Sequence, residues 1–157
     1  MVVWGHSFGD LDPAWGPDMF NASNVLTNED DIWVDYPNNP STANYWITDN
    51  DKTGKFARLF MSFCCTKSIK GFRIKNTHNG EAQNAGTENF SILTSESQDG
   101  PWIPILSGKF SDPRNVDPVP VERFPLTNPI ETRFLAFQVD SFYGPHSSGG
   151  LQYFAVY

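Results

Sequence analysis

The sequence predicts an all-β domain, a two-sheet antiparallel sandwich of about eight short strands joined by long loops. Three observations predict this fold class. Phenylalanine occurs 13 times in 157 residues, beside 5 Trp and 5 Tyr, which favours an aromatic, β-rich core. Twelve Pro and twelve Gly spread along the chain mark many turns. No window of about 12 residues has the i, i+3, i+4, i+7 apolar spacing of an amphipathic helix.

Short alternating apolar runs predict the strands in chain order. Residues 1–22 hold many Gly and Pro beside several aromatics, which predicts an irregular N-terminal segment packed on the sandwich. Residues 23–53 alternate short apolar pieces with acidic or Asn-rich loops. The strand candidates that follow are Phe56–Phe63, Ser68–Lys75, Asn89–Ser95, Trp102–Lys109, Val119–Phe124, Arg133–Asp140 and Leu151–Tyr157. The length predicts a single domain over residues 1–157.

Charge and hydropathy exclude several classes of partner. The net charge is −7, from 11 basic and 18 acidic residues, so no nucleic acid partner is expected. The same charge opposes electrostatic docking on an anionic membrane, and membrane insertion is not expected. No stretch approaches the ~18 apolar residues of a membrane span. The first residues lack the basic and apolar regions of a signal peptide. We expect an intracellular protein, or an extracellular one if a signal peptide has been removed.

The two cysteines, Cys64 and Cys65, are adjacent in the sequence. Neighbouring positions of a strand point to opposite faces, so we expect one thiol to be buried and the other to face away. A disulfide between adjacent cysteines is strained and rare. No second Cys or His pair has the spacing of a zinc site, so neither a disulfide framework nor a cysteine metal site is predicted.

Several segments occur in an order that is typical of one family. They are Asn44-Tyr45-Trp46, FARLFMSF, IKGFRIKNTHNG, GTENFSILTSESQDGPWIPI, ETRFLAFQVDSFYGPHSSGG and LQYFAVY. Together they resemble a discoidin domain, also called the coagulation factor V/VIII type C domain, over roughly Phe20 to Tyr157. The resemblance implies a jelly-roll sandwich of the galactose-binding-like fold that binds its ligands through loops. It also implies that Trp46 and Trp102 lie in the core.

The sequence departs from the family pattern in three places. The Cys pair that joins the two termini in many secreted members is missing, and Cys64-Cys65-Thr66 replaces the usual Asp-Leu-Gly hairpin. The last strand has Gln152-Tyr153-Phe154 where the sugar-binding branch has a glutamate that binds calcium. This last difference weakens the case for calcium as an inherited feature.

An acidic run, Asn28-Glu29-Asp30-Asp31, lies where calcium-bearing relatives have their ion loop. Ca²⁺ takes about 6–8 oxygen ligands, which carboxylates, amide oxygens and backbone carbonyls can supply. We therefore expect Asn28, Asp30 and Asp31 to hold a structural Ca²⁺. The alternative is a solvated acidic turn, because the run lacks a spaced ligand motif.

No catalytic motif accompanies the three histidines, so no enzyme is predicted. Loop histidines can instead hydrogen-bond a ligand hydroxyl or stabilise their own loops, while loop aromatics can stack on a sugar ring or pack under the loops. Trp33 and Tyr36 flank an acidic loop, and Tyr143 lies in SFYGPHSSGG. The residues predicted to bind the ligand are Trp33, Tyr36, Asn38, Asn39, His78, Asn79, Tyr143 and His146.

Three functions remain open at this stage. The first is a non-catalytic carbohydrate-binding or cell-adhesion module whose ligand meets a rim formed by Trp33–Tyr45, Asn76–Gly86 and Phe142–Gly149. The second is a protein-interaction domain within an intracellular or multidomain assembly. The third is a phospholipid-binding module, which the acidic charge disfavours. Since weak single-site sugar binding is often offset by multivalency, an oligomer or a multidomain parent is compatible with the first.

Overall fold

The computed structural model describes residues 1–7, 25–26, 46–47, 57–77, 86–144 and 149–157, and the structural statements below concern these residues. Their regular structure is almost entirely strand, so the all-β prediction is confirmed. The strands are β1 (Val2–Ser7), β2 (Trp46–Ile47), β3 (Arg58–Lys75), β4 (Asn89–Ser95), β5 (Ile103–Lys109), β6 (Val121–Val139), β7 (Gly150–Leu151) and β8 (Tyr153–Val156). No described helix is long and apolar enough to cross a membrane.

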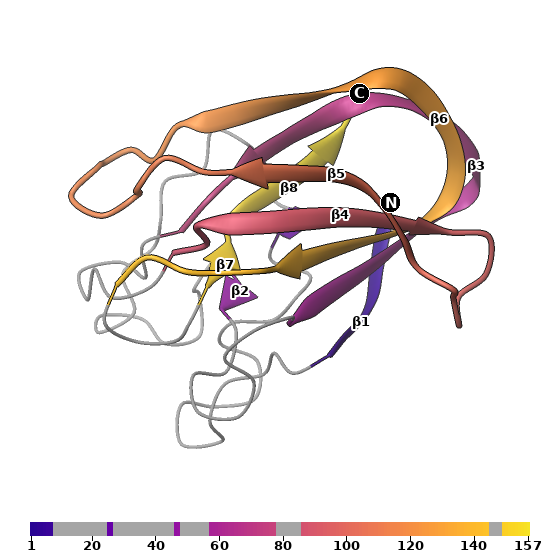
Figure 1. Ribbon diagram of the computed structural model, residues 1–157, viewed down its shortest axis with the longest axis horizontal. Helices are drawn as coiled ribbons and strands as arrows, with labels where there is room; N and C mark the ends of the chain where they lie inside the picture. Colours follow the sequence, from indigo (N-terminus) through magenta and orange to yellow (C-terminus); the bar gives the residue numbers. More distant parts are fainter. Residues whose placement is uncertain (8–24, 27–45, 48–56, 78–85, 145–148) are drawn as a thin grey trace.

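One sheet, folded on itself, makes both layers of the sandwich. Its strand order is β1-β3-β6-β4-β5, with β8 also paired to β3 and a separate β2-β7 pair beside it. The long strands β3 and β6 are antiparallel from Arg58 opposite Gln138 to Lys75 opposite Val121, and they bend together (Figure 1). β3 and β6 pair with each other in both halves. The first half of β3 also pairs with β1 and its second half with β8, while the second half of β6 also pairs with β4.

The bend is built from unequal numbers of residues on the two strands. The pairing of β3 with β6 shifts between Ser62 and Lys67, where residues 63–66 of β3 stand opposite Arg133 alone. It shifts again between Ile69 and Gly71, where residues 126–129 of β6 stand opposite Lys70. Extra residues of this kind bend and twist a strand, and a strand that bends can pass from one layer to the other. The sandwich is therefore closed by two irregularities in one strand pair.

Several sequence predictions need correction at this bend and at the N-terminus. Of the predicted strands Phe56–Phe63 and Ser68–Lys75, residues 58–63 and 68–75 belong to one strand, β3. Of Val119–Phe124 and Arg133–Asp140, residues 121–124 and 133–139 belong to another, β6. The polar residues between the apolar runs indicated loops, but pairing resumes across the bend because both strands turn together. Residues 2–7, predicted to be irregular, form the edge strand β1 against β3.

The prediction that one cysteine is buried is also wrong. Cys64 and Cys65 are both exposed because they lie in the stretch 63–66, where strand pairing is interrupted and side chains no longer alternate between faces. Other boundaries are confirmed: Asn89–Ser95 is β4 as predicted, and β5 begins one residue after the predicted start at Trp102. Trp102 is partly buried, with its ring centroid 5.2 Å from that of Phe60.

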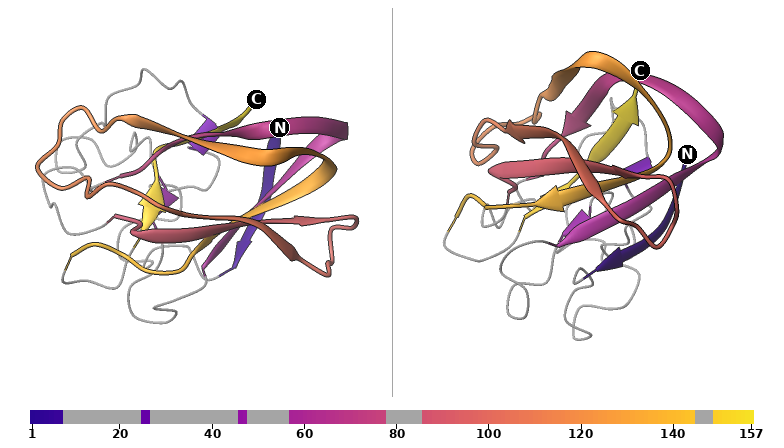
Figure 2. Two further views of the ribbon diagram at one scale, coloured as in Figure 1. Left: turned by 45° about the horizontal axis from the view of Figure 1, so that its top comes forward. Right: turned by 45° about the vertical axis from the view of Figure 1, so that its right-hand side comes forward.

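The core between the layers is aromatic, as the composition predicted. Phe90 on β4 contacts three rings, those of Phe110, Phe124 and Phe137, at centroid distances of 4.6, 4.8 and 5.3 Å. Phe72 and Phe154, from β3 and β8, lie 5.8 Å apart. Aromatic pairs of this kind contribute about 0.5–1.5 kcal/mol each beyond the burial of their surface. The rings of both layers thus hold the folded sheet closed. Figure 2 shows the two layers of strands from two further directions.

Gly108 on β5 lies against the ring of Phe90, on the side where a larger residue would have its Cβ, so replacing this glycine tests the packing. A methyl group at Gly108 would meet Phe90 Cε1 at 2.7 Å and would also crowd Cζ of the same ring. Overpacking a closed core costs about 1–3 kcal/mol, so Gly108→Ala should lower the free energy of unfolding in urea by that amount. Ser107→Ala, at the exposed neighbouring position, is the control and should change it little. Equal stability of both variants would contradict the packing described here.

The two ends of the sandwich differ. Because β3 and β6 fold back, the connections 76–88, 110–120 and 140–149 all leave strands at one end, which we call the loop end. The opposite end, the bend end, contains the bends of β3 and β6 and the connection 96–102. Both chain termini lie toward the bend end, since Val2 pairs with Ser62 and Val156 with Phe72 (Figure 1).

Candidate functional site

Most of the residues predicted to bind a ligand lie outside the described part of the chain. Tyr143 is described, at the loop end. The others are Trp33, Tyr36, Asn38, Asn39, His78, Asn79 and His146, and the predicted calcium ligands Asn28, Asp30 and Asp31 are likewise outside the described residues. For these residues the sequence predictions stay predictions. The site is therefore built from Tyr143 and from the residues that hold the loop end together.

Tyr143 is anchored on both sides of the loop end. Its hydroxyl donates a hydrogen bond to the carbonyl of Phe110 (2.8 Å), and its backbone N–H donates to the carbonyl of Gly86 (2.8 Å). Burial of the partly exposed ring raises the pKa of the phenol. The guanidinium of Arg114 lies 5.9 Å from the ring centroid, within the range of a cation–π contact. The ring thus has a fixed orientation, with a cation beside it.

Two ion pairs surround Tyr143. Arg114 binds Asp112 through two parallel contacts, Nη2 to Oδ2 at 2.6 Å and Nε to Oδ1 at 2.9 Å. Lys109 donates from Nζ to Oε1 of Glu88 at 2.9 Å. The hydrogen bond from Arg114 lowers the pKa of Asp112, and that from Lys109 lowers the pKa of Glu88. All four groups therefore stay charged at neutral pH and present donors and acceptors with little net charge.

A buried amide fixes the base of the loop end. Asn76, 1% exposed, donates from Nδ2 to the carbonyl of Thr87 (2.7 Å). Its Oδ1 accepts from the backbone N–H groups of Thr77 and Thr87, both at 3.0 Å. One side chain thereby joins the two described ends of the connection that contains His78 and Asn79. An amide suits this role because it carries a donor and an acceptor in one plane.

Thr87 extends this contact to the connection between β6 and β7. Its hydroxyl donates to the carbonyl of Gly150 (2.9 Å) and accepts from the Gly150 N–H (3.0 Å). Thr87 also forms an isolated bridge with Phe142. Gly86 packs on Pro113 so closely that a Cβ there would meet Pro113 Cγ at 2.8 Å. Three connections far apart in sequence thus meet at Gly86 and Thr87, so the residues flanking the predicted sites His78 and His146 lie side by side.

Replacing Asn76 tests this loop base. Asn76→Ala would remove the three hydrogen bonds that this buried side chain makes with the backbone of Thr77 and Thr87. A buried polar group that loses its hydrogen bond costs about 1–3 kcal/mol. We expect the free energy of unfolding to fall by about 3 kcal/mol, allowing for partial relaxation. Amide hydrogen exchange of Thr77 and Thr87 should accelerate together. Gln98→Ala, an exposed amide at the bend end, is the control. Exchange unchanged at Thr87 would show that Asn76 does not hold this connection.

Glu122 provides a pH-dependent test of the neighbouring connection. The backbone N–H of Ser111 donates to its Oε1 (3.0 Å), yet burial dominates and raises the pKa of the carboxyl. The folded state therefore binds more protons than the unfolded state between the two pKa values, so this group makes stability fall as pH rises through that window. Glu122→Gln keeps the acceptor without the charge. In thermal melts from about pH 4 to pH 8, it should melt above wild type at neutral pH and match it in acid; the opposite order would refute the burial effect.

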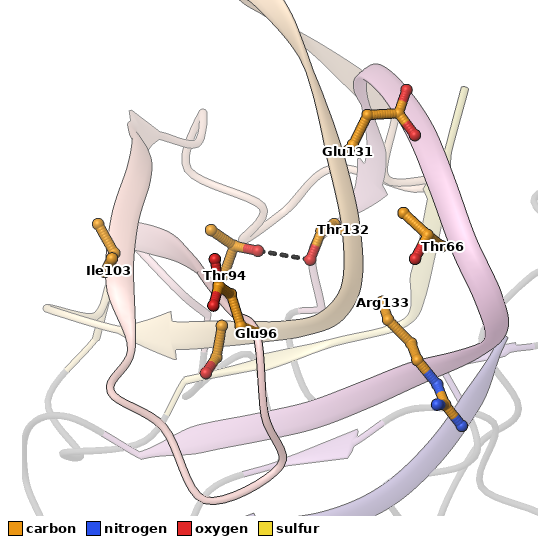
Figure 3. A pocket seen from close by; sticks show the side chains of 8 residues that line it. Thr66, Thr94, Glu96, Ile103, Glu131, Thr132 and Arg133 are labelled. Carbon is orange, nitrogen blue, oxygen red and sulfur yellow. Dashed lines mark hydrogen bonds between the residues drawn. The ribbon is translucent and has the colours of Figure 1, made fainter.

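A second candidate region lies at the bend end. It is a cavity of about 330 Å³ lined by Thr66, Thr94, Ser95, Glu96, Ile103, Glu131, Thr132 and Arg133. The hydroxyls of Thr94 and Thr132 face each other at 2.6 Å across its floor (Figure 3). Arg133 also donates from Nε to the Phe63 carbonyl (3.2 Å), which the interrupted pairing of β3 leaves available. No sequence motif indicated this cavity, because its residues come from strands that only the bend brings together.

Both regions present side chains that can form hydrogen bonds with a ligand. Among the described residues, no three His, Cys, Asp or Glu side chains gather closely enough to hold a metal ion. The loop end offers an oriented aromatic ring, a guanidinium, an ammonium and two carboxylates. Such groups complement a ligand rich in hydroxyls, since each hydroxyl is both a donor and an acceptor.

No protein-family model matches the sequence, and no curated protein sequence is significantly similar to it. Solved structures are similar in fold. One of them is the CBM32 of AlyQ in complex with 4,5-unsaturated mannuronic acid. It has a TM-score of 0.63 and 12% sequence identity, and the match covers 99% of this chain and 95% of that chain. The second is a pectin binding carbohydrate binding module: TM-score 0.60, 13% identity, 99% and 90% covered.

A third similar structure is the family 32 module from C. perfringens NanJ in complex with galactose, with TM-score 0.55, 14% identity, and 71% and 74% of the two chains covered. All three are carbohydrate-binding modules by description. The sequence identities are low, so the likeness concerns the arrangement of strands. The protein thus has the galactose-binding-like β-sandwich fold that these carbohydrate-binding modules share.

Proposed function

We propose that this protein is a non-catalytic carbohydrate-binding module that binds its glycan at the loop end. The observation that carries the proposal is the likeness along 99% of the chain to a module solved with a bound sugar acid. The discoidin-like order of the sequence segments is an independent reason for the same fold and for binding through loops. The rim of the site is formed by Trp33–Tyr45, Asn76–Gly86 and Phe142–Gly149.

The described part of the loop end supports this role chemically. A sugar ring has apolar C–H faces and polar edges, so its sites combine an aromatic surface with groups that match hydroxyls. Tyr143 supplies a fixed ring, and the Arg114–Asp112 and Lys109–Glu88 pairs supply oriented donors and acceptors. Because these groups already hold each other in place, little conformational entropy is lost when a ligand binds.

Charge favours neutral glycans over acidic ones. Two described cations of the loop end, Lys109 and Arg114, are each paired with a carboxylate, and the whole chain has a net charge of −7. A polyuronate would therefore meet general repulsion, which the paired charges of Lys109 and Arg114 offset only weakly. We therefore propose a neutral hexose or oligosaccharide as ligand, with a structural Ca²⁺ at Asn28, Asp30 and Asp31. We further propose that the module acts in cell adhesion as part of an oligomer or a multidomain chain, which raises a weak single-site affinity.

A glycan array with the purified protein tests the proposal, run once with Ca²⁺ and once with chelator. Neutral glycans printed on the array should bind the protein, and the same glycans in solution should compete for that binding. Loss of binding in chelator would support the calcium site, whereas persistent binding would remove the metal from the proposal. Binding confined to uronates would contradict the charge argument. A blank array at high protein density would reject the carbohydrate function and favour a protein partner.

Two variants separate the contribution of Arg114 to binding from the contribution of the Tyr143 hydroxyl to stability. Arg114→Ala removes a charged donor, worth about 1.5–3 kcal/mol in a hydrogen bond to a ligand. We expect glycan affinity by isothermal titration to fall about 10- to 100-fold. Tyr143→Phe keeps the ring but loses the bond to Phe110, so it should lower stability by about 1 kcal/mol while preserving binding.

Lys70→Ala is the matched control, because it removes the same charge at the bend end, where Lys70 is exposed. Its affinity should equal that of the unchanged protein. Equal losses for Lys70→Ala and Arg114→Ala would show a general electrostatic effect and not a contact at the loop end.

A further inference from the structure

The bend-end cavity is lined mainly by polar side chains, none of which belongs to the proposed loop-end site. Its volume of about 330 Å³ lies at the small end of the roughly 300–1,000 Å³ of small-molecule sites. A water molecule occupies about 30 Å³ in the liquid, so the cavity has room for a much larger ligand. Figure 3 shows Ile103 of β5 on one side of the Thr94–Thr132 pair, and Thr66 and Arg133 on the other. Four strands, β3 to β6, thus contribute to its walls.

The hydroxyls of Thr94 and Thr132 present acceptors to this cavity. A threonine hydroxyl has one hydrogen and two lone pairs. One hydrogen of the pair joins the two oxygens (2.6 Å), and the other is donated to the Phe134 carbonyl, which lies 3.1 Å from Thr94 Oγ1 and 3.0 Å from Thr132 Oγ1. The Phe134 N–H donates to Thr132 Oγ1 (3.2 Å). Whichever hydroxyl donates to the other, lone pairs remain free and no hydrogen does, so the pair can accept from a ligand but cannot donate to it.

Ser95 presents a donor to the same cavity. Its side chain lines the cavity although the residue is only 5% exposed. The oxygen accepts a hydrogen bond from the Ser97 N–H (3.2 Å), and within the described part of the chain no group accepts the hydroxyl hydrogen. A buried donor without an acceptor is unfavourable, so this hydroxyl favours a group in the cavity that accepts its hydrogen.

Charged and apolar groups complete the lining. Glu96 and Glu131 contribute carboxylates and Arg133 a guanidinium, and all three residues are exposed. Arg133 uses Nε for the Phe63 carbonyl (3.2 Å), so its terminal nitrogens can donate to a ligand. Ile103, 58% exposed, adds an apolar wall. Because carboxylates and a guanidinium occur together, the lining favours a neutral ligand over a free cation or anion.

We propose that this cavity is a second carbohydrate site, which binds one neutral sugar residue at the bend end. Each sugar hydroxyl both donates and accepts, so one ring can donate to the Thr94–Thr132 pair and accept from Ser95 and Arg133. Its apolar C–H face can pack on Ile103. The site shares no residue with the loop end and does not rest on binding there. With a site at each end, one molecule would join two glycan chains, and this raises the strength of attachment to a surface that displays many of them.

Heteronuclear NMR titration with free D-galactose, D-glucose and D-mannose tests the proposal, because backbone amide shifts report each end separately. The amides of Thr94, Ser95 and Thr132 should shift in a saturable manner with at least one hexose. The dissociation constant should be roughly 1–10 mM, as a small ligand with few polar contacts allows. Arg114→Ala, at the loop end, should leave these shifts unchanged. Saturable shifts at the loop end alone would reject the second site and leave the proposed function standing, whereas shifts at the bend end alone would support the second site without the first.

Two variants locate the binding in the cavity. Thr94→Val keeps the shape of the side chain but removes a hydroxyl of the acceptor pair, so bend-end affinity should fall about 10-fold. Thr66→Trp places a large ring at an exposed position of the lining and should abolish the saturable shifts, with little change in melting temperature. Ser107→Trp is the matched control, because it adds the same ring at an exposed position of β5 outside the lining. It should titrate like the unchanged protein.

Three results would overturn the proposal. One is the absence of saturable shifts at the bend end with all of these hexoses. Another is unchanged affinity in Thr66→Trp, which would place the binding outside the cavity. The third is an equal loss in Ser107→Trp, which would mean that any added ring on this sheet disturbs the signal. If Thr94→Val does not fold, the comparison of Thr66→Trp with Ser107→Trp still decides the question.

Discussion

The paired bend of β3 and β6 is the constraint on which the rest of this structure depends. Where the two antiparallel strands bend from one layer to the other, their local path lengths differ, and residues 63–66 of β3 and 126–129 of β6 supply these local differences. The crossing brings Phe72 and Phe124 over Phe90 and Phe137, which closes the aromatic core. It also directs the connections 76–88, 110–120 and 140–149 to the same end, while the chain termini lie toward the other.

At the loop end, polar contacts replace apolar packing as the organising interaction. Asn76 and Thr87 are almost fully buried, and their side chains satisfy backbone groups that no strand ladder reaches. A buried polar network stabilises one arrangement strongly, because any displacement leaves a donor or acceptor without a partner. The loops of this end therefore start from a rigid base even though they come from distant parts of the chain. Rigid bases of this kind are what allow loops to carry binding specificity.

The bend end has a different chemistry that follows from the same strand irregularity. Where β3 loses its partner, Arg133 binds the Phe63 carbonyl, Thr66 and Thr132 line a cavity, and Cys64 and Cys65 face solvent together. One break in a strand ladder thus creates a cavity and a dithiol on a surface that lies opposite the loop end. The closed aromatic core separates the two ends.

The sequence alone determined the fold class, the aromatic core and several strand boundaries, since alternation and turn residues act over a few neighbouring positions. The residue order also predicted the galactose-binding-like sandwich and placed Tyr143 in a loop of the candidate site. It could not show that the apolar runs flanking Cys64–Lys67 form one strand, because a polar stretch looks the same in a loop and in a paired bend. Nor could it show that Arg114 lies beside Tyr143 or that Asn76 joins Thr87 to the chain near Thr77. Those relations, and the exposure of both cysteines, were decided only by the tertiary structure, because they depend on which strands pair and where that pairing is interrupted.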